Sequence, residues 1–153
     1  MADELTDKEL REVCFNIFRQ AHGREEHFQD GYESVFSREL SWLIQTYSHR
    51  AITAIEGIFI NTHEYLVSEA LRQIGYIKHE PTNAVRRWLL EKHLQSSYVI
   101  RDGAIIGIAS MDDPNSIPAI KQALQFETAE NLRIDLLQVL EQLEATPHEG
   151  SPS

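Results

Sequence analysis

The fold of this chain is decided by a stretch that reads Val99-Ile100-Arg101-Asp102-Gly103-Ala104, then Asp112-Asp113-Pro114, then Ile117-Pro118-Ala119-Ile120. Its apolar residues recur three and four positions apart, which is the period of an amphipathic helix. The residue before Pro114 is pushed out of helical geometry, so the chain turns there. Pro118 falls in the first turn of the next helix, where its missing amide hydrogen costs little. The stretch therefore predicts two helices joined by a tight turn.

The same pattern recurs along the chain at a fixed interval. Glu69, Asp102 and Asp135 are 33 positions apart at each step, and Pro81 and Pro114 share that interval. A period of about 20 to 50 residues is typical of stacked helix pairs, in which each pair buries its apolar face against its neighbours. The alternative is a helical bundle without repeats, in which these coincidences arise by chance.

The quoted residues, continued to Leu124, resemble one HEAT-like repeat of the bacterial type, which is also found in phycobilin lyases. The resemblance spans about 62–144, and one further step back makes Tyr32–Asn61 a degenerate repeat. It implies an all-α, short right-handed, armadillo-like α-solenoid of about three to four helical hairpins, with first helices on the convex face and second helices on the concave face. Gly107 and Ile108 stand where the family pattern usually has Leu and Gly, so we expect the close packing of the neighbouring helix to depart from the family pattern at that point.

We predict a single domain over residues 1–145. Residues 1–31 hold a capping helix, Asp7–Ala21, and a loop; residues 32–144 hold the repeats, and 146–153 form a disordered tail. In the degenerate repeat, the apolar spacing predicts helices over Tyr32–Tyr47 and His49–Ile60. Asn61-Thr62-His63-Glu64 resembles a capping box that opens the next helix.

Composition narrows the class of protein. The chain has 153 residues, one cysteine and a net charge of −10. This charge argues against nucleic-acid binding, because phosphate neutralisation needs a surplus of Lys and Arg. Cys14 excludes an intrachain disulfide and lies on an apolar helix face, so we interpret it as a core residue. The start lacks signal-peptide features and no apolar run is long enough to cross a membrane, so we expect a cytoplasmic protein.

Charge is distributed unevenly. Residues 1–35 carry four basic and nine acidic side chains, 36–97 carry seven and six, and 98–153 carry three and nine. The middle third is therefore where an acidic partner would be least repelled. It contains Arg86-Arg87-Trp88-Leu89-Leu90-Glu91-Lys92-His93, on a predicted second helix of a pair.

This segment supplies the predicted partner-binding residues. With Val85, Trp88 and Leu89 facing inward, helical spacing turns outward Arg86, Arg87, Leu90 and His93. Guanidinium groups beside an exposed leucine suit a protein surface that carries carboxylates. We predict a non-catalytic scaffold that binds an acidic protein through its concave face, with a site made of Arg50, Thr53, Arg86, Arg87, Leu90, His93 and Gln122. The alternative for this patch is an ordinary solvated face.

Other patterns are weaker. His22, Glu26 and Asp30 would share one helix face, with His27 adjacent, but Gly23 and Gly31 argue against a rigid helix. We expect neither a metal nor a cofactor, and no phosphate-binding or nucleophile motif points to an enzyme. Gly103 and Gly107 have the spacing of a helix contact, which we interpret as close packing within the chain.

Two other functions remain open. The resemblance to phycobilin-lyase repeats implies that the chain could be a subunit of a lyase-like, chromophore-handling factor. The third possibility is a structural subunit that forms homo-oligomers through an exposed end of its helix stack.

Overall fold

The computed structural model describes residues 4–24 and 34–145, and this part of the chain is all-helical with no strands. It contains eight α-helices and three short 3-10 helices: α1 (Asp7–Arg24), α2 (Val35–Tyr47), α3 (His49–Phe59), α4 (Glu64–Tyr76), η1 (Glu80–Thr82), α5 (Asn83–Lys92), η2 (His93–Gln95), α6 (Tyr98–Met111), η3 (Pro114–Ser116), α7 (Ile117–Phe126) and α8 (Glu130–Ala145). The predicted all-α class is confirmed. None of the described helices is long and apolar enough to span a membrane.

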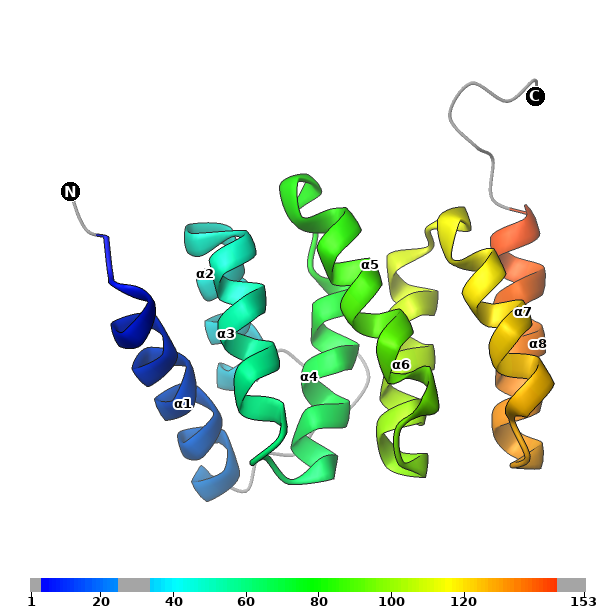
Figure 1. Cartoon of the computed structure of the whole chain (residues 1–153), viewed down its shortest axis with the longest axis horizontal. Helices are drawn as coiled ribbons and strands as arrows, with labels where there is room; N and C mark the ends of the chain where they lie inside the picture. Colours follow the sequence, from blue (N-terminus) through cyan, green and yellow to red (C-terminus); the bar gives the residue numbers. More distant parts are fainter. Residues whose placement is uncertain (1–3, 25–33, 146–153) are drawn as a thin grey trace.

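The helices form two layers that lie face to face (Figure 1). We call α1, α3, α5 and α7 the odd layer, and α2, α4, α6 and α8 the even layer. Consecutive helices run up one layer and down the other, and successive pairs stand side by side. Between the layers lies a core of aliphatic side chains with Phe18 and Phe36, whose rings meet edge to face at 5.0 Å between centroids.

Side chains 33 positions apart meet across the even layer. Ser97 Oγ donates to Glu64 Oε1 at 2.8 Å, and Gln142 Nε2 donates to the carbonyl oxygen of Ala109 at 2.9 Å. The same separation joins two further hydrogen-bonded pairs, Gln45 with the carbonyl of Lys78 and Asn131 with the hydroxyl of Tyr98. All four pairs are 33 residues apart, so the predicted interval is the register in which these helices stack.

Helices α4 and α6 approach until their backbones touch. A Cβ atom on Gly75 would lie 2.0 Å from the carbonyl oxygen of Gly107, and one on Gly103 would lie 2.4 Å from Ser68 Oγ. Only hydrogen fits at these positions. The interpretation of Gly103 and Gly107 as a close contact within the chain is confirmed.

Two local predictions were wrong. Helix α1 continues to Arg24 instead of ending at Ala21. The capping box does not form, because His63 is the N-cap of α4 and its Nδ1 accepts from the amide of Tyr65 at 3.2 Å. Glu64 accepts from Ser97 of the next pair instead of reaching back to its own helix start.

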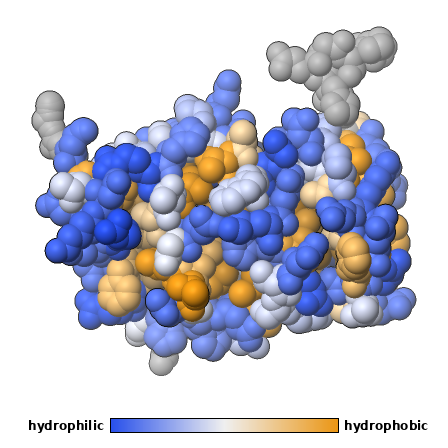
Figure 2. Space-filling model, in the orientation of Figure 1, coloured by the Kyte–Doolittle hydropathy of each residue, from blue (hydrophilic) through white to orange (hydrophobic). Residues whose placement is uncertain are grey.

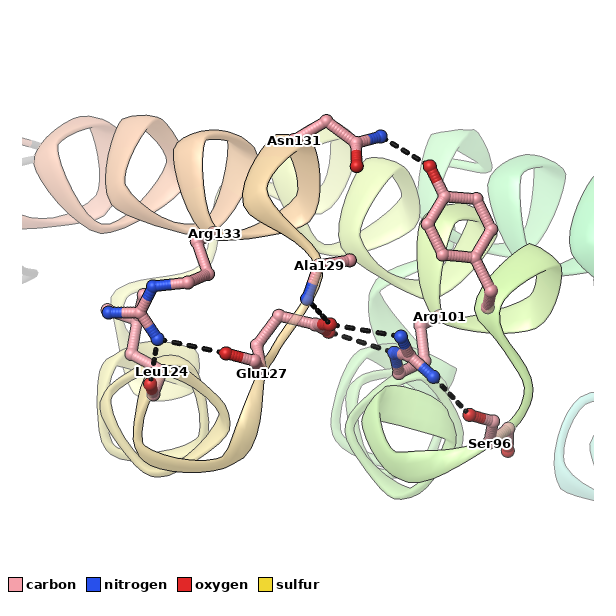
Figure 3. Close-up of polar contacts among 8 residues, drawn as sticks. Ser96, Arg101, Leu124, Glu127, Ala129, Asn131 and Arg133 are labelled. Atoms are coloured by element: carbon pink, nitrogen blue, oxygen red, sulfur yellow. Dashed lines mark hydrogen bonds and ion pairs between the residues drawn. The ribbon is translucent and has the colours of Figure 1, made fainter.

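A polar cluster joins α6 to the turn between α7 and α8 (Figure 3). Arg101 donates to both carboxylate oxygens of Glu127, at 2.8 and 2.9 Å, and to the carbonyl of Ser96 at 3.0 Å. Arg133 donates from the other side to the carbonyl oxygens of Leu124 and Glu127. Burial alone would raise the pKa of Glu127, but the hydrogen bonds from Arg101 and the amide of Ala129 hold it below its ordinary value.

The backbone contact predicts opposite effects for two glycine substitutions. Gly75→Ala should lower the free energy of unfolding by about 3 kcal/mol, since the new methyl group meets backbone that cannot move aside alone. Gly57→Ala is the control, because no atom lies within 4 Å of its added Cβ and alanine favours the helix by up to about 1 kcal/mol. Urea unfolding of both variants measures the difference. A Gly75→Ala variant as stable as Gly57→Ala would contradict the contact.

The Arg101–Glu127 pair predicts a pH dependence of stability. A carboxylate whose folded pKa is lowered stabilises the fold at neutral pH, and this contribution is lost as pH falls below about 4.5 through the folded pKa. Glu127→Gln should therefore be less stable than the parent chain by about 2 kcal/mol at neutral pH, with the gap narrowing in acid. Urea unfolding across this pH range tests it, with the exposed Glu130→Gln as control. A constant gap would contradict the role of the ionised carboxylate.

Candidate functional site

Helix α5 presents a different face from the predicted one. Arg86 is 1% exposed and Leu90 is buried, whereas Trp88 is 48% exposed. The predictions that Arg86 and Leu90 face outward and that Trp88 faces inward were wrong. Positions 86, 89 and 90 share one helical face, so burial of Leu89 together with Leu90 brings Arg86 inward.

The guanidinium of Arg86 donates its hydrogen bonds to uncharged oxygen atoms, which belong to the end of α4, to the turn that joins α4 to α5 and to the first residue of α5. Its Nε donates to Thr82 Oγ1 at 2.9 Å, and its terminal nitrogens donate to the carbonyls of Ile74 at 2.7 Å and His79 at 3.1 Å, and to Asn83 Oδ1. Burial lowers the pKa of the guanidinium. Ile74 lies in the last turn of α4, where carbonyls lack partners within the helix. Arg86 therefore closes a helix end, and no partner can reach it.

Two more of the predicted residues are engaged within the fold. Arg87 pairs with Glu91 at 3.1 Å and with Asp113 at 3.5 Å, which ties α5 to the turn before α7. His93 is half-buried, with Nδ1 2.8 Å from the carbonyl oxygen of Leu89. Both side chains keep a minor part of their surface exposed.

The remaining predicted residues lie on α3 and α7. Arg50 pairs with Asp7 at 3.0 Å and thereby holds the start of α1 against α3. Thr53 is exposed on α3, and its hydroxyl donates to the carbonyl of His49. Gln122 is exposed on α7. Arg86 and Leu90 are buried and leave the predicted set, and partner binding by Arg50, Thr53, Arg87, His93 and Gln122 stays a prediction.

The exposed surface of α5 centres on Trp88. The ammonium of Lys92 lies 4.6 Å from the centroid of the Trp88 ring, a cation–π contact, and also pairs with Glu56 of α3. Beside this pair, a hollow of about 320 Å³ opens between α3 and α5. Its apolar lining includes Phe59, Val67 and Ile100, and its edge is formed by Ile60, which is 86% exposed.

A larger pocket of about 640 Å³ lies between α1, the end of α3 and the start of α4. Ile60 lines this pocket as well as the smaller hollow, so the two recesses adjoin. Figure 2 shows hydrophobic residues gathered on this face between the positions of α1 and α3. The odd layer thus carries two neighbouring apolar recesses and a tryptophan on one surface. We call this combination the α1–α5 surface.

Cys14 and the histidine and acidic side chains are the remaining candidates for chemistry. Cys14 is buried, as predicted, and burial raises the pKa of its thiol to about 12, so the reactive thiolate is scarce at neutral pH. Glu26, His27 and Asp30 lie outside the described residues. Within residues 4–24 and 34–145, no three His, Cys, Asp or Glu side chains converge on a common point.

Trp88, Lys92 and Ile60 were not among the predicted site residues, although all three are exposed. One signal was available, because adjacent Leu89 and Leu90 can both be buried only if Trp88 turns outward. No comparable signal marks the pocket, since α1 and α3 meet only through the tertiary fold.

Comparisons with protein-family models, curated proteins and solved structures gave no match to this chain. The resemblance of residues 62–144 to a HEAT-like repeat accordingly stays a prediction.

Because Arg86 is buried and Arg87 is partly exposed, we expect the two arginines to contribute unequally to stability. Arg86→Ala should lower the free energy of unfolding by about 3 kcal/mol or more, because it leaves several buried acceptors without donors. Arg87→Ala should lower it by about 1 kcal/mol or less, since its ion pairs are partly exposed. Thermal and urea unfolding measure both values. Equal losses in the two variants would contradict the assignment of Arg86 to the interior.

Proposed function

We propose that the chain is a short, right-handed HEAT-like α-solenoid that binds a partner protein across its odd layer without catalysing a reaction. The 33-residue hydrogen-bond register and the side-by-side stacking of helix pairs support the architecture. In such a stack each layer forms a continuous surface wide enough for another protein. Both described recesses open on the odd layer, which contains the second helices of the pairs, α3, α5 and α7.

The observation that carries the binding proposal is the α1–α5 surface. Trp88 stands exposed beside a hollow, and Ile60 projects between that hollow and the larger pocket. Tryptophan is enriched among the residues that dominate interface energies, and apolar recesses receive the anchoring side chains of partners. An exposed apolar surface with recesses marks an interaction site more often than solitary apolar residues do.

The proposed partner carries both apolar and acidic side chains. Residues 36–97, which hold Trp88 and Lys92, have seven basic and six acidic side chains in a chain whose net charge is −10. Lys92 keeps part of its surface exposed while it pairs with Glu56. A carboxylate on the partner could approach Lys92 with less repulsion than elsewhere on the molecule.

A second candidate function is self-association through the last helix. Ile134 and Leu137 of α8 are both about half exposed, and α8 is the final described helix of the even layer. Sedimentation of the purified chain over a range of concentrations distinguishes this candidate from binding to a different protein.

The two tryptophans give a matched test of the proposed surface. Trp88 in the odd layer and Trp42 in the even layer are 48% and 49% exposed, so replacing either with alanine removes a similar exposed area. We expect Trp88→Ala to lose a protein that co-purifies from native lysate with the parent chain, with an affinity loss of about tenfold or more. Trp42→Ala should retain it.

Quantitative affinity purification with the parent chain, Trp88→Ala and Trp42→Ala measures how much of the co-purifying protein each one retains. Circular dichroism confirms that both variants are folded before they are used. Retention of every co-purifying protein by Trp88→Ala, or equal losses from both variants, would contradict the proposed surface.

A further inference from the structure

The pocket between α1 and α3 has apolar walls. Phe15 and Phe18 of α1 line one side, and Ile58, Ile60 and Leu66 line the other. Phe15 is about half exposed and Ile60 almost fully exposed, so these side chains give up water-contacting surface when the pocket fills. Its volume of about 640 Å³ lies within the range of about 300–1,000 Å³ in which proteins hold small molecules.

Within the part of the chain that the structure describes, the charged side chain in the lining is the guanidinium of Arg19. The imidazoles of His22 and His63 also line the pocket, and no carboxylate of residues 4–24 and 34–145 does. Among the described residues, Arg19 donates one long hydrogen bond, to Asn16 Oδ1 at 3.4 Å, and pairs with no carboxylate. Its side chain is exposed, and most of its donors have no partner in these described ranges.

The two histidines add hydrogen-bond donors from different elements. His63 Nδ1 accepts from the amide of Tyr65 at 3.2 Å, so in the neutral ring the proton lies on Nε2. The ring of His63 stacks on that of Tyr65 at 5.3 Å between centroids, which restricts its rotation. The ring of His22, from the end of α1, lies 6.5 Å from that of His63. Both rings border the pocket beside its apolar walls.

We propose that this pocket binds a small amphipathic carboxylate, an aliphatic or aromatic monocarboxylic acid. Its apolar body would lie against Phe15, Ile58 and Ile60, and its carboxylate would accept hydrogen bonds from Arg19 and the imidazoles. Guanidinium–carboxylate hydrogen bonds are among the stronger ones in proteins, and an alkylammonium of the same length would be repelled. The pocket is one of the two recesses of the α1–α5 surface, but binding of a carboxylate in it depends neither on Trp88 nor on a partner protein.

Binding is tested with decanoate and with decylamine as the matched cation of equal chain length. Calorimetric titration of the full chain should give saturable, one-site binding of decanoate and affinity at least about tenfold weaker for decylamine. In amide NMR spectra, decanoate should shift the signals of Gly57 and Thr62, which line the pocket.

Variants separate the pocket from other parts of the molecule. Arg19→Glu should weaken decanoate binding at least about tenfold, whereas Arg11→Glu, an exposed arginine of the same helix outside the lining, should leave it unchanged. Trp88→Ala should also leave it unchanged, whatever its effect on partner binding. Absence of saturable decanoate binding, equal affinity for decylamine, or full binding by folded Arg19→Glu would overturn the proposal.

Discussion

The contact on which the rest of the structure depends is the meeting of the α4 and α6 backbones at Gly75, Gly103 and Gly107. With hydrogen in place of side chains, the two helices approach until the carbonyl of one faces the α-carbon of the other. The even layer is tightest there, and aliphatic side chains fill the space between layers. Both described recesses, in contrast, open between helices of the odd layer. The glycines thus close the packing within the even layer, while the α1–α5 surface of the odd layer keeps its recesses.

Much of this architecture could be predicted from the residues. The spacing of Glu69, Asp102 and Asp135 indicated how far along the chain the pattern repeats, and hydrogen bonds such as that between Glu64 and Ser97 follow the same interval. The periodic signal is readable because the same interval separates hydrogen-bonded residues in successive helix pairs. Local signals were less reliable. A capping box at Asn61 satisfied the sequence rule, but Ser97 of the next pair engages Glu64.

The binding surface was harder to predict because Arg86 is buried, whereas arginine side chains are usually exposed. Charged side chains are rarely buried, so assigning Arg86 to the outside was the reasonable choice from sequence. Its acceptors include the carbonyls of Ile74 and His79. Both residues precede α5, so the sequence of α5 alone does not show that acceptors are available. Burial of Arg86 rotates Trp88 into solvent, so the predicted orientations of Arg86, Trp88 and Leu90 were wrong together. The pocket beside Arg19 arises from segments about 40 positions apart, and no local pattern could indicate it.

The fixed register restricts how such a chain can change in length. One residue inserted within a helix turns every later position by about 100°, so apolar side chains would leave the core and pairs such as Ala109 with Gln142 would separate. Insertions in the connections avoid this rotation. Growth within the stack itself would need blocks of 33 residues, each bringing a complete helix pair. Viable length variants should therefore differ either at the turns or by whole units.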